Sequence, residues 1–274
     1  MKKRSVLEKI AAAPHILWSV MFIVGPLLFV IYFAFTDYYG NFTFDNITGL
    51  SQYFNTFVLS IGFALIATVI CLLIGYPLAY FMSKASPKRR SVLLVLLMLP
   101  MWINLLIRTY ALMSLLDNGG LFNTLLQSIG LPKVKIVGTS GAVILGMIYD
   151  FLPYMVLPIY TVMIKLDARY IEAAHDLGCN NRQVLFNVII PLTVPGIVSG
   201  ITMVFVPSIS TFYISQKLGG GTFDLIGDTI ERQFQNEITY NIGAAISLVM
   251  MILILISIAI MNRFTDNDEG GILV

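Results

Sequence analysis

The sequence has little charge. Asp, Glu, Lys and Arg make up only 12% of its 274 residues, about half of the roughly 25% that is usual in soluble domains. The 17 Lys and Arg nearly balance the 15 Asp and Glu, whereas a protein that binds nucleic acid by neutralising phosphates carries a clear basic excess. The scarcity of charge therefore excludes an ordinary soluble domain, and its balance argues against a nucleic-acid partner.

Residues that carry chemistry are also few. The two cysteines, Cys71 and Cys179, have neither the spacing of a disulfide framework nor that of a zinc site. His15 and His175 stand far apart and belong to no Ser/His/Asp set, so we expect structural or surface roles for both. The glycine run 219–221 lacks the lysine of a phosphate-binding loop. We therefore predict that this chain has no catalytic residue, metal site or cofactor and is not itself an enzyme.

Apolar sequence, in contrast, is abundant. Hydrophobic residues make up 57% of the chain, and the mean hydropathy is +0.84. A helix of about 20 apolar residues crosses a hydrocarbon core of about 30 Å. The pattern predicts an all-α integral membrane protein, a single transmembrane domain over residues 1–274 with six membrane-spanning helices. The expected spans are 15–36, 53–82, 91–114, 138–165, 188–215 and 241–262.

The distribution of Lys and Arg predicts the orientation of these spans. The two termini and the loops on their side carry twelve Lys and Arg, and the loops on the opposite side carry four. Because cytoplasmic loops are enriched in these residues, we expect both termini in the cytoplasm. The first span is too long for a signal peptide and no cleavage site follows it, so it should be retained. Outside the membrane, the apolar periodicity of residues 121–129 predicts a short amphipathic helix on the surface.

The most informative segment is the polar stretch 166–187 between the fourth and fifth spans. The sequence predicts a helix over 172–177, with Asp167 as its N-cap and Gly178 as the left-handed residue that ends it. A second short helix should start near Asn181 and run into the membrane. Two short helices that meet at a glycine form a compact knob, which is either a plain connector or a docking element for a cytoplasmic partner.

The residues of this knob carry a resemblance. Glu172-Ala173-Ala174, then Gly178, and then Val188-x-Ile190-Pro191 resemble the EAA loop of permease subunits of bacterial ABC importers. The family pattern ends in Ile-x-Leu-Pro, so two positions differ by a conservative aliphatic exchange. The resemblance implies the type I (MetI-like) fold, in which five core helices follow one extra helix. It also implies that a coupling helix contacts an ATPase subunit. The residues expected in that contact are Glu172, Ala173, Ala174, Asp176 and Gly178.

The resemblance also implies partners and a location. A homologous second permease should complete the pathway, two ATPase subunits should bind ATP and Mg inside, and a solute-binding protein should deliver substrate outside. The expected location is the bacterial cytoplasmic membrane. The acidic outer loop 216–240, which carries Asp224, Asp228, Glu231 and Glu237, would either receive the binding protein or simply be solvated.

One branch of the family resembles most of the chain. Segments 100–110, 149–158, 166–167, 173–178 and 190–196 are similar to spermidine/putrescine importer permeases, which implies a polyamine substrate. Two alternatives stay open. One is an ABC permease for another small solute, such as an anion, an iron complex or a phosphonate. The other is a secondary transporter or channel, for which inverted repeats would be expected.

Several residues are candidates for the substrate pathway. Asp150 would be an ammonium partner beside the rings of Tyr149 and Tyr154, which could add cation–π attraction. The alternative is that Asp150 pairs with Arg108 or lies at the outer boundary. Further candidates are Trp102, Ser208, Thr211 and Tyr213, although aromatic residues also gather at membrane interfaces by default.

The fifth span carries two further features. Pro191, Pro195 and Pro207 should kink it. Gly196 and Gly200 lie four residues apart and should permit a close approach of another helix. The alternative for both features is ordinary packing.

Overall fold

A computed structural model describes residues 14–269 of the chain. Within these residues the secondary structure is helical, apart from one isolated β-bridge between Thr36 and Phe42. The contacts divide the chain into two compact units, one formed by residues up to 54 together with 229–253, and the other by 55–228 together with the residues from 254 onward. The expected all-α fold is confirmed.

The smaller unit contains the first apolar helix. Helix runs from Pro14 to Ala34 and includes a π-helical turn, η1 (Val20–Val24), before α2 (Gly25–Ala34). The short α3 (Asp45–Thr48) and η2 (Gly49–Tyr53) follow. The Asn46 side chain donates to the carbonyls of Ala34 and Thr36, and the Asn241 side chain also donates to Thr36. These amides satisfy carbonyl groups that the end of α2 leaves without helical partners.

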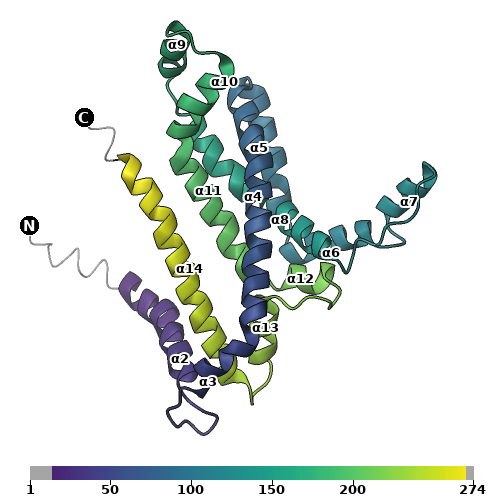
Figure 1. The fold of residues 1–274 in the computed structure, drawn as a ribbon, viewed down its shortest axis with the longest axis vertical. Coiled ribbons are helices and arrows are strands. Elements are labelled where there is room, and N and C mark those ends of the chain that lie inside the picture. Colours follow the sequence, from purple (N-terminus) through teal and green to yellow (C-terminus); the bar gives the residue numbers. More distant parts are fainter. Residues whose placement is uncertain (1–13, 270–274) are drawn as a thin grey trace, which may run out of the picture. The chain divides into compact units, whose positions relative to one another are not determined.

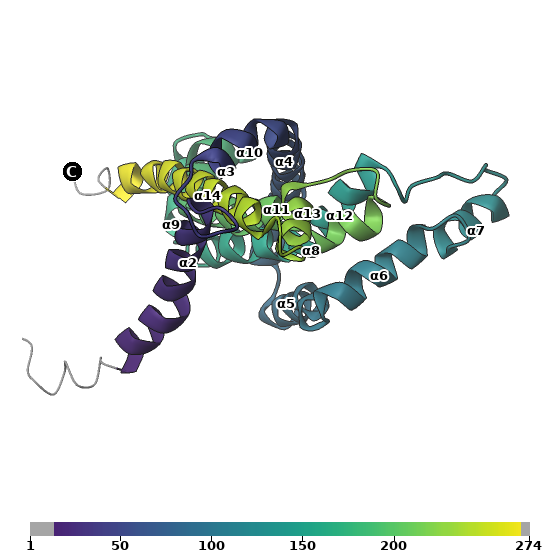
Figure 2. The same ribbon diagram turned by 90° about the horizontal axis from the view of Figure 1, so that it is seen from below.

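The larger unit holds most of the helices. They are α4 (Phe54–Lys84), α5 (Pro87–Trp102), α6 (Leu105–Leu116), α7 (Leu121–Ser128), α8 (Ser140–Met163), α9 (Ala168–Asp176), α10 (Asn181–Val184), η3 (Leu185–Ile189), α11 (Ile190–Ser210) and α12 (Tyr213–Leu218). Two further helices contribute residues to both units, α13 (Ile226–Phe234) and α14 (Tyr240–Glu269). Figure 2 shows α6 and α7 extending away from α8 and α11.

The core of the larger unit lies between α4, α8 and α11. Met147, Met155 and Ile159 of α8 are fully buried there. A Cβ atom on Gly196 would lie 3.0 Å from the Pro158 carbonyl oxygen and 3.1 Å from the Ile159 Cα atom. A Cβ atom on Gly200 would likewise lie 3.0 Å from the Met155 carbonyl oxygen. The two glycines therefore let α11 lie directly against the backbone of α8, as the sequence pattern predicts.

The apolar spans match five of the six expected ones in type and approximate position. Five helices are long and apolar enough to cross a membrane: Pro14–Ala34, Asp45–Lys84, Ser140–Met163, Asn181–Ser210 and Tyr240–Arg263. The fifth expected span, 188–215, is shorter at its end, because α11 stops at Ser210 and α12 forms a separate helix.

The third expected span, 91–114, is broken in the structure. The helices Pro87–Trp102 and Leu105–Ser128 meet at a bend of 95°. Ile103 and Asn104 have extended ψ values of 136° and 135°, and the Asn104 side chain accepts a hydrogen bond of 2.8 Å from Leu106 N–H. The cap starts a new helix in a new direction, and Pro100 lacks the N–H that a continuous helix would use. A continuous span was expected because the apolar run hides these signals.

Candidate coupling element and pathway residues

The coupling-loop candidate begins with α9. The Asp167 side chain caps it by accepting a hydrogen bond of 3.0 Å from Arg169 N–H, as expected from the sequence. The Arg169 guanidinium also donates to this carboxylate, and it holds the pKa of Asp167 below its usual value. Gly178 has a φ of +84°, the left-handed conformation that ends the helix. The predicted knob is present, although α9 begins at Ala168, four residues before the expected start at Glu172, and ends at Asp176.

A second capped helix leads from the knob into α11. Asn180 and Gln183 form a reciprocal capping box with hydrogen bonds of 2.9 and 2.8 Å. From there α10 continues through the π-helical η3 into α11 without a loop. His175 Nδ1 lies 3.0 Å from the Cys179 carbonyl oxygen, so it has a local structural contact. Displacement of α9 would therefore be passed to α11 through a chain of capped helical turns.

The residues expected to contact the ATPase subunit divide into exposed and buried ones. Glu172, Ala173 and Asp176 are exposed, as is Gly178. Ala174 instead packs into the core of this chain, with only 7% of its surface accessible. Its small side chain therefore permits α9 to approach its own chain closely. Direct contact with another subunit would involve its exposed neighbours, including Leu177, which is 85% exposed.

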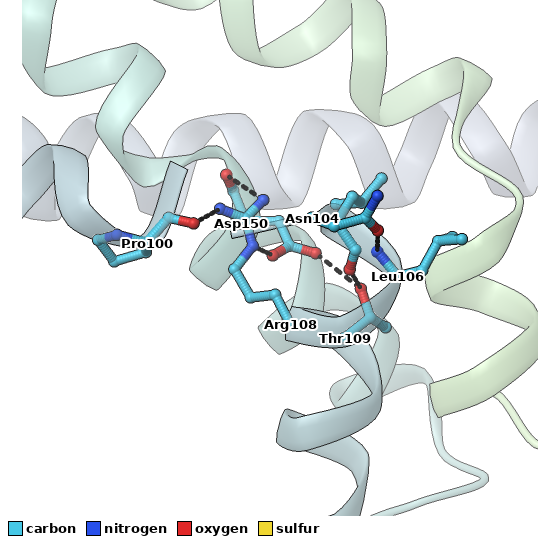
Figure 3. Close-up of polar contacts among 7 residues, drawn as sticks. Pro100, Asn104, Leu106, Arg108, Thr109 and Asp150 are labelled. Carbon is cyan, nitrogen blue, oxygen red and sulfur yellow. Dashed lines mark hydrogen bonds and ion pairs between the residues drawn. The ribbon is translucent and has the colours of Figure 1, made fainter. Parts of the chain in front are cut away.

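The pathway candidates centre on a buried ion pair (Figure 3). Asp150, on α8, is fully buried, and its carboxylate pairs with the Arg108 guanidinium of α6. Thr109 donates a second hydrogen bond of 3.2 Å to this carboxylate. Arg108 Nη1 also donates to the Pro100 carbonyl at 3.0 Å, close to the break between α5 and α6. The alternative pairing of Asp150 with Arg108 is thus present in the structure, and this carboxylate is neutralised within the chain.

The neighbouring aromatic candidates are more accessible. The Tyr149 ring is 41% exposed, with the Arg108 guanidinium carbon 5.8 Å from its centroid. Tyr154 is 36% exposed and lies beside Phe151. Trp102, at the end of α5, is 74% exposed. These rings present π faces that a cation could approach.

The candidates on α11 and α12 occupy different environments. Ser208 is buried and donates to the Val204 carbonyl of its own helix, and Thr211 is nearly buried. Tyr213 lines an apolar hollow of about 370 Å³ with Leu106, Ile107, Tyr110 and Ala111. The structure therefore places Tyr213 beside α6, and it places the Ser208 hydroxyl in helix packing.

Two functional-looking residues were not singled out from the sequence. Thr109 completes the Asp150 site, and its position directly after Arg108 was the available signal. Asn123, on α7, is fully buried and bonds to Asp117 and to both backbone groups of Val134. It was expected on a polar face of an amphipathic helix, and no sequence signal distinguishes such an amide from an exposed one. Among the described residues, no cluster of three potential metal ligands occurs.

Comparison with known proteins identifies the family. Residues 73–267 match the model of the binding-protein-dependent transport system inner membrane components. The spermidine/putrescine transport system permease protein PotB of Haemophilus influenzae is 40% identical over 266 residues, with 93% of each chain covered. PotB of Escherichia coli is 40% identical over 245 residues, covering 86% of this chain and 89% of its own.

Solved structures show the same fold. A bacterial ABC transporter that imports the acidic polysaccharide alginate matches with a TM-score of 0.77 and 20% identity, covering 95% of both chains. The same TM-score is found for a bacterial alginate ABC transporter in complex with a pentasaccharide-bound periplasmic protein, at 21% identity over 94% of this chain and 93% of that one.

Proposed function

This chain belongs to the family of binding-protein-dependent transport system inner membrane components, and from this premise we propose that it forms the pathway for polyamines in an ATP-driven importer. The proposal of a polyamine substrate is supported by the 40% identity to two spermidine/putrescine permeases along nearly the whole chain. The alginate importers share the fold at about half that identity, so the fold alone does not select the solute.

The remaining subunits of the importer follow from the same premise. A homologous permease completes the pathway, and two ATPase subunits bind ATP and Mg on the cytoplasmic side. A solute-binding protein delivers the polyamine from outside. Both termini and the loop 166–187 lie in the cytoplasm, because twelve Lys and Arg lie on that side against four on the other.

Coupling runs through the knob formed by α9 and α10. The exposed Glu172, Ala173 and Leu177 contact the ATPase subunit, while the buried Ala174 fixes α9 to the core of this chain. Closure of the ATPase subunits moves α9, and the continuous helical path through η3 moves α11 against α8. Alternation of these packed helices opens the pathway to one side of the membrane at a time.

Substrate binding relies on rings more than on a buried carboxylate. Asp150 is neutralised by Arg108, so Tyr149, Tyr154, Trp102 and Tyr213 supply the attraction for ammonium groups and methylenes. Ser208, in the last turn of α11, and Thr211, directly after that helix, are buried in helix packing and would face the substrate only when these helices move apart.

The test is uptake of labelled spermidine by cells that lack this chain, with and without its restoration. We expect restored, energy-dependent uptake that putrescine competes for and unrelated anions do not. Replacement of Gly178 by Trp should abolish uptake while the chain still reaches the membrane, because Gly178 ends α9 in a left-handed conformation. Gly130→Trp is the matched control, since Gly130 also has positive φ and open space around it but follows α7.

Uptake that survives Gly178→Trp would overturn the coupling role. If the complex assembles again but spermidine uptake is not restored, in cells with no other polyamine importer, the proposed polyamine substrate is wrong.

A further inference from the structure

We propose that a pocket at the base of α9 binds the phosphate headgroup of an anionic phospholipid. The pocket has a volume of about 230 Å³ and lies between the last turns of α4, the first turn of α5, the end of α8 and the start of α9. Figure 1 shows these four helix ends together at one end of the larger unit, next to α10. The inference rests on the proposed function for its side of the membrane, which is the cytoplasmic one.

Two cations line the pocket without an anionic partner. Lys84, the last residue of α4, has its ammonium 5.7 Å from the Tyr80 ring centroid. Arg90, in the first turns of α5, donates from Nη2 to the Ser83 carbonyl at 2.7 Å. Its Nε atom is buried and has no hydrogen-bond partner among the side chains that the structure describes, those of residues 14–263. Among the same side chains, neither cation forms an ion pair with a carboxylate.

This arrangement leaves a donor that a phosphate would satisfy. A buried N–H without a partner costs free energy, and a guanidinium matches phosphate oxygens through several parallel hydrogen bonds. Ser83 occupies only one of the terminal nitrogens of Arg90. A phosphate in the pocket would accept from Nε and would also lie within the field of the Lys84 ammonium.

The remaining walls favour a lipid over a soluble phosphate. Met163, Ile164, Ile171 and Ile189 line the pocket with apolar surface. Met163 is the last residue of the membrane-spanning α8, so the pocket lies at the depth where headgroups meet acyl chains. An amphiphile would cover the cations and the apolar wall together, whereas free phosphate would leave the apolar wall uncovered.

The pocket has a mechanical connection to α9. Ala168 and Ile171 of α9 line it opposite α4, so a bound headgroup would brace the coupling helix against the end of α4. We therefore expect occupancy to increase the ATPase activity that the substrate-loaded binding protein stimulates.

The test compares two pairs of substitutions in the purified importer, held in nanodiscs of phosphatidylcholine with or without phosphatidylglycerol. Lys84→Gln/Arg90→Gln removes the pocket cations. Lys88→Gln/Arg89→Gln removes the same charge from exposed neighbours on α5 that do not line the pocket. Native mass spectrometry measures the phosphatidylglycerol that each complex retains.

We expect the pocket pair to lose retained phosphatidylglycerol on the order of tenfold, and the neighbouring pair to lose much less. Lys84→Gln alone should show part of this loss, and it removes no hydrogen bond that stabilises the fold. Equal losses for both pairs would mean diffuse surface attraction and would overturn the site. Displacement of the retained phosphatidylglycerol by soluble glycerol phosphate would mean a general anion site and would overturn its lipid nature.

Three further outcomes separate this inference from the proposed function. Loss of ATPase subunits from the pocket variant, with retained lipid unchanged, would assign the cations to the subunit interface and overturn the lipid site. Lipid retention is measured without transport, so normal spermidine uptake without bound phosphatidylglycerol would refute the lipid site alone. Bound lipid without spermidine uptake would refute the proposed substrate alone.

Discussion

At the residue scale, Arg108 links three parts of the chain. Its guanidinium pairs with Asp150 on α8, donates to Pro100 at the end of α5, and lies near the Tyr149 ring. A buried ion pair gains little over apolar packing, but the loss of one partner leaves an uncompensated charge. The Arg108–Asp150 pair therefore specifies how α6 joins α8.

We expect Arg108→Met to destabilise the purified protein by about 3 to 5 kcal/mol, because Asp150 is then buried without a cation. Asp150→Leu alone should be similarly costly, and the double variant should recover much of the loss. Thermal unfolding in detergent measures all three. Additive losses in the double variant would show that the two side chains do not act as a pair.

Asp228 gives a pH dependence at the same scale. This buried carboxylate accepts a hydrogen bond of 3.0 Å from Leu225 N–H, and burial raises the pKa of Asp228 to about 6. The folded chain thus binds more protons than the unfolded chain between about pH 4 and pH 6. The free energy of unfolding falls as the pH rises through this window, and it stays at the lower value at higher pH.

Asp228→Asn should remove this loss of stability, because the amide carries no charge, and its oxygen can still accept the hydrogen bond from Leu225 N–H. We expect the free energy of unfolding of the variant to exceed that of the wild type by at most about 3 kcal/mol at about pH 7.5, measured as a higher melting temperature, and by less at about pH 5. The exposed Glu237→Gln serves as the control for the loss of one charge. An advantage for Asp228→Asn that is independent of pH would contradict the assignment.

At the element scale, the contact between α8 and α11 depends on two glycines. Two of the three atoms nearest to a Cβ on Gly196, the Pro158 carbonyl oxygen and the Ile159 Cα atom, belong to the backbone of α8 and cannot rotate away, and the third is a methyl group of Val162. Gly196→Ala should therefore force the helices apart and cost about 1 to 3 kcal/mol, measured as a lower melting temperature in detergent. The control is Gly62→Ala in α4, which meets no atom within 4 Å and should be neutral or stabilising. Equal effects of the two changes would refute the close packing.

Some elements could be predicted from the sequence, and others could not. Asp167 and Gly178 gave the ends of α9 because capping depends on local geometry alone. The bend between α5 and α6 was missed because its signals, Pro100 and Asn104, lie inside an apolar run that is long enough to be continuous. The burial of Ala174 depends on which face of α9 meets the core, and a nine-residue helix does not reveal that face.

The pathway residues were harder to predict for a related reason. Whether Asp150 faces a substrate or Arg108 depends on the direction of α6, which the bend determines. From the sequence, Asp150 was expected either to meet a substrate ammonium group, to pair with Arg108 or to lie at the outer boundary. Only the arrangement of three helices selects Arg108.

At the scale of the whole molecule, the chain forms two units, each assembled from segments distant in sequence. The smaller has its own core, in which Ala34 packs with Ala244, Ala245 and Leu248. The family match over 73–267 covers most of the larger unit and leaves out the first apolar helix. The family-defining part of the chain is therefore the part that contains α8, α9 and α11.

The bend after Trp102 has a consequence for the surrounding lipid. Because α6 turns away by 95°, α5 is the only helix of this bent pair that continues in its own direction, and its 16 residues extend only about 24 Å. Its first turn carries Lys88, Arg89 and Arg90, so the apolar part is shorter still. A hydrocarbon layer of about 30 Å must compress beside such a segment. The bilayer around this permease is thus expected to be locally thin, and lipids with shorter acyl chains should gather along α5.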